Sequence, residues 1–250
     1  MKPLLCSLLL FSAFSLNAQA PVAVPAAKEP HHHLVLENSY VRVLRVSVPA
    51  HDATLLHQHD VPYIYVALGP GDVINAVAGK PEAHLVMTDG QVGYSRGGFA
   101  HIARTDAGLV FNNVTIELLH PQGEPRNLCE QVIDSPLSDC ENPPSSKLPP
   151  DSSLRTPARF AKMERLFETD EILAESASLA PRASYIQSGS QPSQLLIALD
   201  NSEVRVDVQG KPSKSLHSGE ALWLPAGNPP TIANLNGHGA SRFLLCSFKN

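Results

Sequence analysis

The sequence predicts an all-β protein built from two similar β units, and three observations support this fold class. Short runs rich in β-branched and aromatic residues recur between residues 34 and 119, and again from about residue 185 to 248. Glycine, proline and aspartate turn signals separate the runs, and no helical period lies between them within either half. The runs of the first half recur in the same order in the second half. Many short strands at such spacing are typical of a β-sandwich or a β-barrel.

The composition is that of an ordinary globular protein. The chain has 250 residues, 43% of them hydrophobic and 17% charged, with a formal net charge of −5. This length suits one large domain or two modest ones. Lysine and arginine are scattered singly, so no basic face is predicted and we expect no nucleic-acid partner.

Residues 1–20 have the pattern of a secretory signal peptide. Lys2 gives a positive start, residues 4–14 form an apolar run, and Ala18-Gln19-Ala20 offers a small-residue cleavage site. The run is shorter than the roughly 20 apolar residues that a spanning helix needs. We therefore expect an exported protein, periplasmic or secreted, with no membrane span in its mature form. An uncleaved membrane anchor is the alternative.

The first β unit is expected over residues 34–120, after a flexible lead-in at residues 21–33. His31, His32 and His33 in the lead-in are expected to be a solvated tract, since adjacent residues of an extended chain point to opposite faces. The expected strands are residues 41–48, 63–68, 83–87, 91–94, 100–104 and 109–119.

Residues 121–180 are predicted to be a linker that is rich in proline and serine and contains one short helix. Apolar residues at three- and four-residue steps predict the helix over residues 160–174. Cys129 and Cys140 also lie in this segment. In an oxidising compartment they could close a short loop, but the sequence leaves their pairing open.

The second β unit is expected over residues 181–250. Residues 63–69, 90–94 and 110–119 find counterparts in residues 195–200, 219–223 and 243–248. This order indicates duplication of one unit, with chance similarity among β-rich segments as the alternative. Cys246 lies in the apolar run 243–248 and is expected to be a buried thiol.

The histidine pair His57-Gln58-His59 is the sharpest chemical feature. Residues two apart on a strand face the same side, so both imidazoles can point into one pocket. A third histidine, His101, follows the Gly97-Gly98 turn. Imidazole suits zinc, copper, iron and nickel. The three histidines together therefore predict a metal site, with polar filling of a degenerate barrel as the alternative.

These residues resemble the two sequence motifs of the cupin superfamily. The second cupin motif runs Gly-x5-Pro-x-Gly-x2-His-x3-Asn. Gly90, Gly98 and His101 fit it, while Arg96 replaces the proline and Thr105 the asparagine. In the first motif, Gly-x5-His-x-His-x3–4-Glu-x6-Gly, the two histidines fit and Gly69 falls within a residue of the closing glycine. The resemblance covers residues 34–119 by motif and residues 183–250 by topology.

The resemblance implies two jelly-roll β-barrels, as in bicupins, with the metal held by His57, His59 and His101 in the first. Aligning the halves places Ser188 and Ser190 opposite the histidine pair, so the second barrel is expected to be degenerate. Cupins usually add a glutamate three or four residues after the second histidine, where this chain has Tyr63 or Ile64. The site therefore resembles the minority of cupins, thiol and diketone dioxygenases among them, that hold iron with three histidines. We expect a divalent first-row metal ion, with iron favoured.

Two functions are consistent with these features. The first is a dioxygenase-type oxidoreductase that acts on a small organic substrate. Tyr63 or Tyr65 is then a candidate hydrogen-bond donor beside the metal, or else a packed barrel tyrosine, and Arg96 is a candidate countercharge for the substrate. The alternative is a non-catalytic β-barrel that binds a small ligand or stabilises an envelope complex. Cupins often dimerise, so the resemblance also implies a homodimer.

Overall fold

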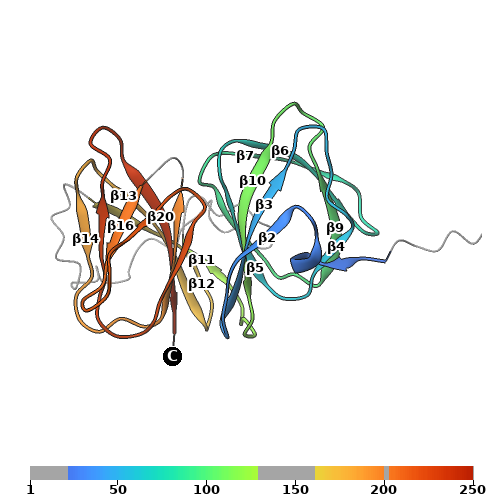
Figure 1. The fold of residues 1–250 in the computed structure, drawn as a ribbon. Helices are drawn as coiled ribbons and strands as arrows, with labels where there is room; N and C mark the ends of the chain where they lie inside the picture. Colours follow the sequence, from blue (N-terminus) through green and yellow to red (C-terminus); the bar gives the residue numbers. More distant parts are fainter. Residues whose placement is uncertain (1–21, 129–160, 200–202, 250) are drawn as a thin grey trace, which may run out of the picture.

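The computed structural model describes residues 22–128, 161–199 and 203–249. The predicted signal peptide and the pair Cys129 and Cys140 lie outside these ranges. Within them the chain is almost entirely β-structure, in two sandwich-like units that lie side by side (Figure 1). The predicted all-β fold class is confirmed. No helix in the described ranges has the length and apolar character needed to cross a membrane.

The first unit consists of two five-stranded sheets. One has the order β1-β4-β9-β6-β7, formed by β1 (Val24–Pro25), β4 (His57–His59), β9 (Phe99–Arg104), β6 (Gly71–Val77) and β7 (Ala83–Met87). The other has the order β2-β3-β10-β5-β8, formed by β2 (His32–Glu37), β3 (Val41–Val48), β10 (Phe111–Leu118), β5 (Tyr63–Ala67) and β8 (Val92–Ser95).

The second unit repeats this arrangement. Its larger sheet has the order β11-β12-β13-β20-β15-β18, formed by β11 (Arg126–Asn127), β12 (Ala161–Glu168), β13 (Ile172–Leu179), β20 (Ser241–Phe248), β15 (Gln194–Leu199) and β18 (Ala221–Leu224). Its smaller sheet has the order β14-β19-β16-β17, formed by β14 (Ser184–Ile186), β19 (Thr231–Asn234), β16 (Val204–Asp207) and β17 (Lys214–Leu216). Apart from the added edge strands β1 and β11, the strand orders of the two units match one to one. The predicted duplication therefore holds at the level of topology.

The short helix predicted over residues 160–174 is wrong. Residues 161–174 form β12 and the start of β13, so the second unit, which also includes β11, begins well before residue 181. The register of β12 against β13 shifts between Arg165 and Phe167. Such a bulge breaks the two-residue alternation, so that Leu166 and Phe167 are both fully buried. The irregular apolar spacing that resembled a helical period comes from this bulge.

The flexible lead-in predicted over residues 21–33 is also wrong. Strand β1 pairs in parallel with β4, a short 3-10 turn follows at Ala26–Lys28, and β2 begins at His32. Ala26 and Glu29 are each 1% exposed and His32 is 8% exposed. Contacts with strands that are distant in the sequence hold this segment in place, and a local sequence pattern cannot reveal such contacts.

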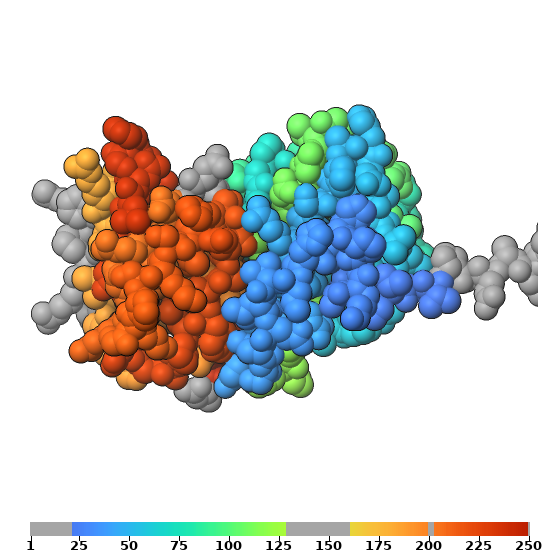
Figure 2. Space-filling model, in the orientation of Figure 1, coloured from blue at the N-terminus to red at the C-terminus, as the bar shows by residue number. Residues whose placement is uncertain are grey.

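The two units share one hydrophobic core. The outer face of the β2-β3-β10-β5-β8 sheet, with Val41, Val43 and Ile64, packs against Phe167, Leu195 and Leu244 of the second unit. The opposite face of the same sheet contributes Val46, Val48 and Ala67 to a separate cluster inside the first unit. This sheet is therefore buried on both sides, and the surfaces of the two units meet without a break (Figure 2).

Candidate metal centre

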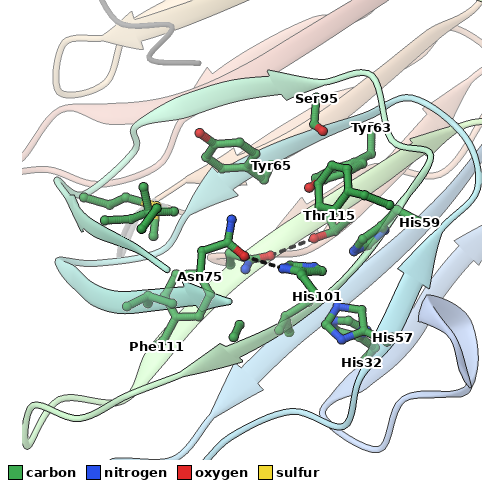
Figure 3. Close-up of a pocket in the computed structure, with 18 residues that line it drawn as sticks. His32, His57, His59, Tyr63, Tyr65, Asn75, Ser95, His101, Phe111 and Thr115 are labelled. Atoms are coloured by element: carbon green, nitrogen blue, oxygen red, sulfur yellow. Dashed lines mark hydrogen bonds between the residues drawn. The ribbon is translucent and has the colours of Figure 1, made fainter. Parts of the chain in front are cut away.

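Strands β4 and β9 bring the three predicted histidines together between the sheets of the first unit. His57 and His59 point to the same side of β4 and are 1% and 2% exposed. His101 lies directly opposite His57 in the antiparallel register of β4 and β9. One ligand nitrogen from each ring can be chosen so that all three lie within 4.8 Å of one another (Figure 3).

Each of the three imidazoles is oriented through its Nδ1 atom. The acceptors are the Leu55 carbonyl oxygen for His57 (2.9 Å), Glu117 Oε1 for His59 (3.3 Å) and Asn75 Oδ1 for His101 (2.6 Å). A neutral ring that donates its Nδ1–H keeps the lone pair on Nε2. His101 Nε2 is buried and has no hydrogen-bond partner among the described residues. Such an unpaired acceptor fits a metal ligand, because ligating histidines usually donate their other N–H to a carboxylate or a carbonyl group.

Glu117 is the charged member of this outer layer. It lies on β10, is 3% exposed, and its Oε2 atom accepts a 2.9 Å hydrogen bond from Arg42 Nη1. Burial raises the pKa of the Glu117 carboxyl, but hydrogen bonds from His59 and Arg42 outweigh it and hold the pKa below its usual value. The carboxylate is therefore ionised. Its negative charge makes the His59 ring more basic, so that Nε2 would bind a metal ion more strongly.

The three histidines line a pocket with a volume of about 410 Å³. Its walls are mostly apolar and include Val46, Val73, Met87 and Phe111. Polar groups come from Tyr63, Tyr65, Asn75, Ser95, Asn113 and Thr115 (Figure 3). No aspartate, glutamate, lysine or arginine lines the pocket in the described ranges. It has the size and character of a small-molecule site.

Solved structures with this architecture are numerous, although no protein-family model and no curated protein matches the sequence. AerE from Microcystis aeruginosa is 10% identical, with a TM-score of 0.61 over 92% of this chain and 98% of that one. A cupin 2 conserved barrel domain protein from Leptotrichia buccalis is 12% identical, with a TM-score of 0.51 over 91% of this chain and 92% of that one. The chain has the cupin fold. A salicylate 1,2-dioxygenase from Pseudaminobacter salicylatoxidans shares it at 12% identity and a TM-score of 0.53, over 84% of this chain and 71% of the dioxygenase.

The glutamate that the first cupin motif usually supplies has no replacement from a carboxylate in this pocket. Tyr63 stands near its place and stacks on the His59 ring, with centroids 4.2 Å apart and an interplanar angle of 28°. Tyr63 therefore packs beside a candidate ligand and also lines the pocket. A metal ion held by these three histidines would therefore have neutral protein ligands.

Arg96 is not among the residues that line the pocket. Its guanidinium group donates hydrogen bonds of 3.2 and 2.7 Å to the exposed Glu124 carboxylate. The structure therefore gives Arg96 a partner on the protein surface, and it offers no support for a role opposite the substrate.

The second cupin unit has no comparable site in its described residues. The strand equivalent to β4 is β14, which ends before the expected counterparts Ser188 and Ser190. Its buried residue is Tyr185, which joins Ile232, Phe243 and Leu245 in an apolar cluster inside the unit. Side chains of this size fill the interior, in keeping with a degenerate barrel.

Sequence reasoning missed Glu117, Asn75 and His32 at this site. Glu117 and Asn75 contact histidines 58 and 26 residues away in the sequence. A strand residue that contacts a ligand carries no local signal, because strand pairing alone determines the contact. For His32, the two flanking histidines drew attention to the tract but concealed that only the middle one is buried.

The pH dependence of stability provides a first test of the buried histidines. Burial lowers the pKa of His101 from 6.5 to about 2, and the neighbouring histidines contribute a smaller part of this shift. Burial likewise lowers the pKa of His57 to about 4. Below pH 6.5 the unfolded chain takes up protons that the folded metal-free protein does not. Urea unfolding of the metal-free protein should therefore show stability falling from pH 7 towards pH 4, and His101→Gln should reduce this fall. An identical pH profile in the variant would contradict the inference.

Gly93 on β8 makes room for the pocket tyrosine Tyr65. The two residues are cross-strand partners, and a Cβ atom at position 93 would collide with the Tyr65 ring. Gly93→Ala should therefore displace the ring and lower the free energy of unfolding by about 1–3 kcal/mol. Urea denaturation measures this loss, and the added substitution Tyr65→Leu should recover part of it. Simple additivity of the two substitutions would show that the collision is not the cause.

Proposed function

We propose that the protein is an exported metal-dependent oxidoreductase of the dioxygenase type that acts on a small organic substrate, with His57, His59 and His101 as metal ligands. The observation that carries the proposal is the common orientation of the three imidazoles. Each Nδ1 has an acceptor, and the buried His101 Nε2 atom has no partner in the described structure. A divalent first-row metal ion, iron favoured, would polarise a bound substrate or bring it together with dioxygen.

The chain's own residues have two tasks in this proposal. The apolar walls exclude water around the ligands, which strengthens polar interactions inside the pocket. Tyr63, Tyr65 and Asn75 provide hydrogen-bonding groups along the same cavity. Because no cationic side chain lines the pocket in the described ranges, the substrate is expected to be neutral or to place its only negative charge on the metal.

Metal analysis of the purified mature protein tests the site. After growth or reconstitution with iron, the wild type should carry about one equivalent of metal, and His57→Ala should carry almost none. His217→Ala is the matched control, since His217 is an exposed histidine of the second unit. A correctly folded wild type that binds no first-row metal would refute the proposal.

Oxygen consumption distinguishes the proposed enzyme from a binding protein. The iron-loaded wild type should consume oxygen with at least one member of a panel of thiols, diketones and catechols, and His57→Ala should not. The second candidate is a non-catalytic ligand-binding module of the cell envelope, which the missing glutamate and the filled interior of the second unit favour. Metal and ligand binding without oxygen uptake would support that alternative.

Light scattering on the same sample tests for the expected homodimer, and fractionation of the producing cells tests for export.

A further inference from the structure

A fourth histidine, His32, lies beside the three candidate ligands. It is the first residue of β2, its side chain is 4% exposed, and it lines the same pocket. Its ring centroid is 4.7 Å from that of His57 and 6.0 Å from that of His59 (Figure 3). The three candidate ligands themselves lie 4.3 to 5.4 Å apart by the same measure. His32 is thus part of one cluster of imidazoles.

The orientation of His32 repeats that of the three candidate ligands. Its Nδ1 atom is 2.8 Å from the Ala26 carbonyl oxygen, which accepts the N–H. The lone pair of the neutral ring is therefore on Nε2, as it is in His57, His59 and His101. Burial lowers the pKa of His32 despite the nearby Glu29 carboxylate, which is consistent with a neutral ring. Donation of one nitrogen to a backbone carbonyl is the usual arrangement of a ligating histidine.

Residues 24–32, here named the N-terminal strap, fix His32 against the ligand strand. In the strap, Val24 pairs with His57 in the parallel β1–β4 ladder. Its buried Glu29 carboxylate accepts hydrogen bonds from the backbone N–H of His31 (2.7 Å) and of Leu55 (3.1 Å). The carbonyl group of Leu55 in turn orients His57. One set of contacts therefore holds both His32 and His57.

Two of the three ring distances from His32 suit a metal ion shared with the candidate ligands. With a metal–nitrogen distance of roughly 2.1 Å, ring centroids of adjacent octahedral ligands lie about 4.6 Å apart and those of opposite ligands about 6.5 Å apart. The distances of His32 to His57 and His59, 4.7 and 6.0 Å, are close to the adjacent and the opposite case. Of the three candidate ligands, only His57 and His59 have a ring contact with His32, and His32 is outside the group of nitrogens that lie within 4.8 Å of one another. Binding of His32 to the same ion therefore requires the strap to move towards His101.

We propose that His32 is a fourth imidazole ligand, which the N-terminal strap delivers to the site in place of the missing cupin glutamate. This inference rests on the proposed metal binding at His57, His59 and His101. Four neutral imidazoles carry no negative charge on the ligand atoms themselves, so such a site favours an anionic group of the substrate as a further ligand.

Cadmium NMR tests the ligand count without any mutation. The wild type is labelled with nitrogen-15 at histidine and loaded with a spin-active cadmium isotope, and each ligating Nε2 atom then shows coupling to the metal. Four coupled imidazoles are expected. Three coupled imidazoles would overturn the role of His32 but leave the proposed function standing. A wild type that binds no cadmium, zinc or iron would refute the proposed function itself.

A matched pair of variants tests the contribution to affinity. His32→Gln should weaken zinc binding by about 100-fold in competition with a chelator, at least the effect of losing an outer-layer partner. His33→Gln should leave the affinity unchanged, since the neighbouring side chain is exposed. Equal affinities of His32→Gln and the wild type would overturn the inference. Should His32→Gln fail to fold, the cadmium experiment on the wild type still decides.

Discussion

Replacing Glu117 by glutamine is expected to weaken metal binding by about 10- to 100-fold, the usual effect of losing an outer partner of a ligating histidine. Glu117 Oε1 accepts the Nδ1–H of His59 at 3.3 Å. Glutamine keeps the size of the side chain and one acceptor oxygen, but removes the negative charge that makes His59 more basic. Isothermal titration of the metal-free variant with zinc measures the change directly, without any assay of activity.

Glu37, the second carboxylate partner of Arg42, provides a matched control for this experiment. Its guanidinium group joins the buried Glu117 to the exposed Glu37, which it contacts at 3.0 and 3.2 Å. Glu37→Gln therefore removes a carboxylate from the same arginine without touching a histidine. We expect this variant to bind zinc as tightly as the wild type. If Glu117→Gln and Glu37→Gln weaken zinc binding equally, the cause is the loss of a negative charge beside Arg42 and not the loss of the Glu117 contact with His59.

The sequence predicts the three clustered histidines, two from their spacing on a strand and the third from its place in the second cupin motif. His57 and His59 are two residues apart on a strand, so they share a face, and both are buried in the structure. His101 matches the second cupin motif together with Gly98, whose backbone φ of 75° suits glycine. The surrounding acceptors could not be found in this way. Glu117 and Asn75 reach the histidines only through the pairing of strands that are distant in the sequence.

The errors in the fold prediction have similar causes. No strand was expected at residues 71–77, because the run Gly69-Pro70-Gly71-Asp72 favours a turn, yet strand β6 begins at Gly71. In β12, the bulge next to Phe167 produced an apolar spacing that resembled a helix. In both segments, pairing with other strands outweighs local preference. The duplicated strand order could be predicted because the two units carry the same succession of apolar runs.

Truncation of Phe167 to alanine is expected to destabilise the protein by about 3–5 kcal/mol, the typical cost of deleting a buried phenylalanine. Phe167 is fully buried in the shared core, and its ring meets that of Tyr94 in the first unit at 5.3 Å and 61°. The substitution leaves a cavity where the two large sheets meet. Trp223 is the only tryptophan of the chain and packs against Tyr40 of the first unit, so its fluorescence reports unfolding at this interface.

Ile186→Ala is the control for this truncation, because Ile186 is 56% exposed and its loss should cost less than about 0.5 kcal/mol. Equal stabilities of the two variants would show that the interface contributes little.

The metal affinity of Phe167→Ala, measured under conditions in which the variant remains folded, then separates two roles of the second unit. Val46 and Phe111 line the pocket on the face of the sheet opposite to the interface residues Val43 and Ile64. Unchanged affinity would mean that the second unit only stabilises the first. Weaker binding would mean that packing at the interface also determines the positions of the histidines.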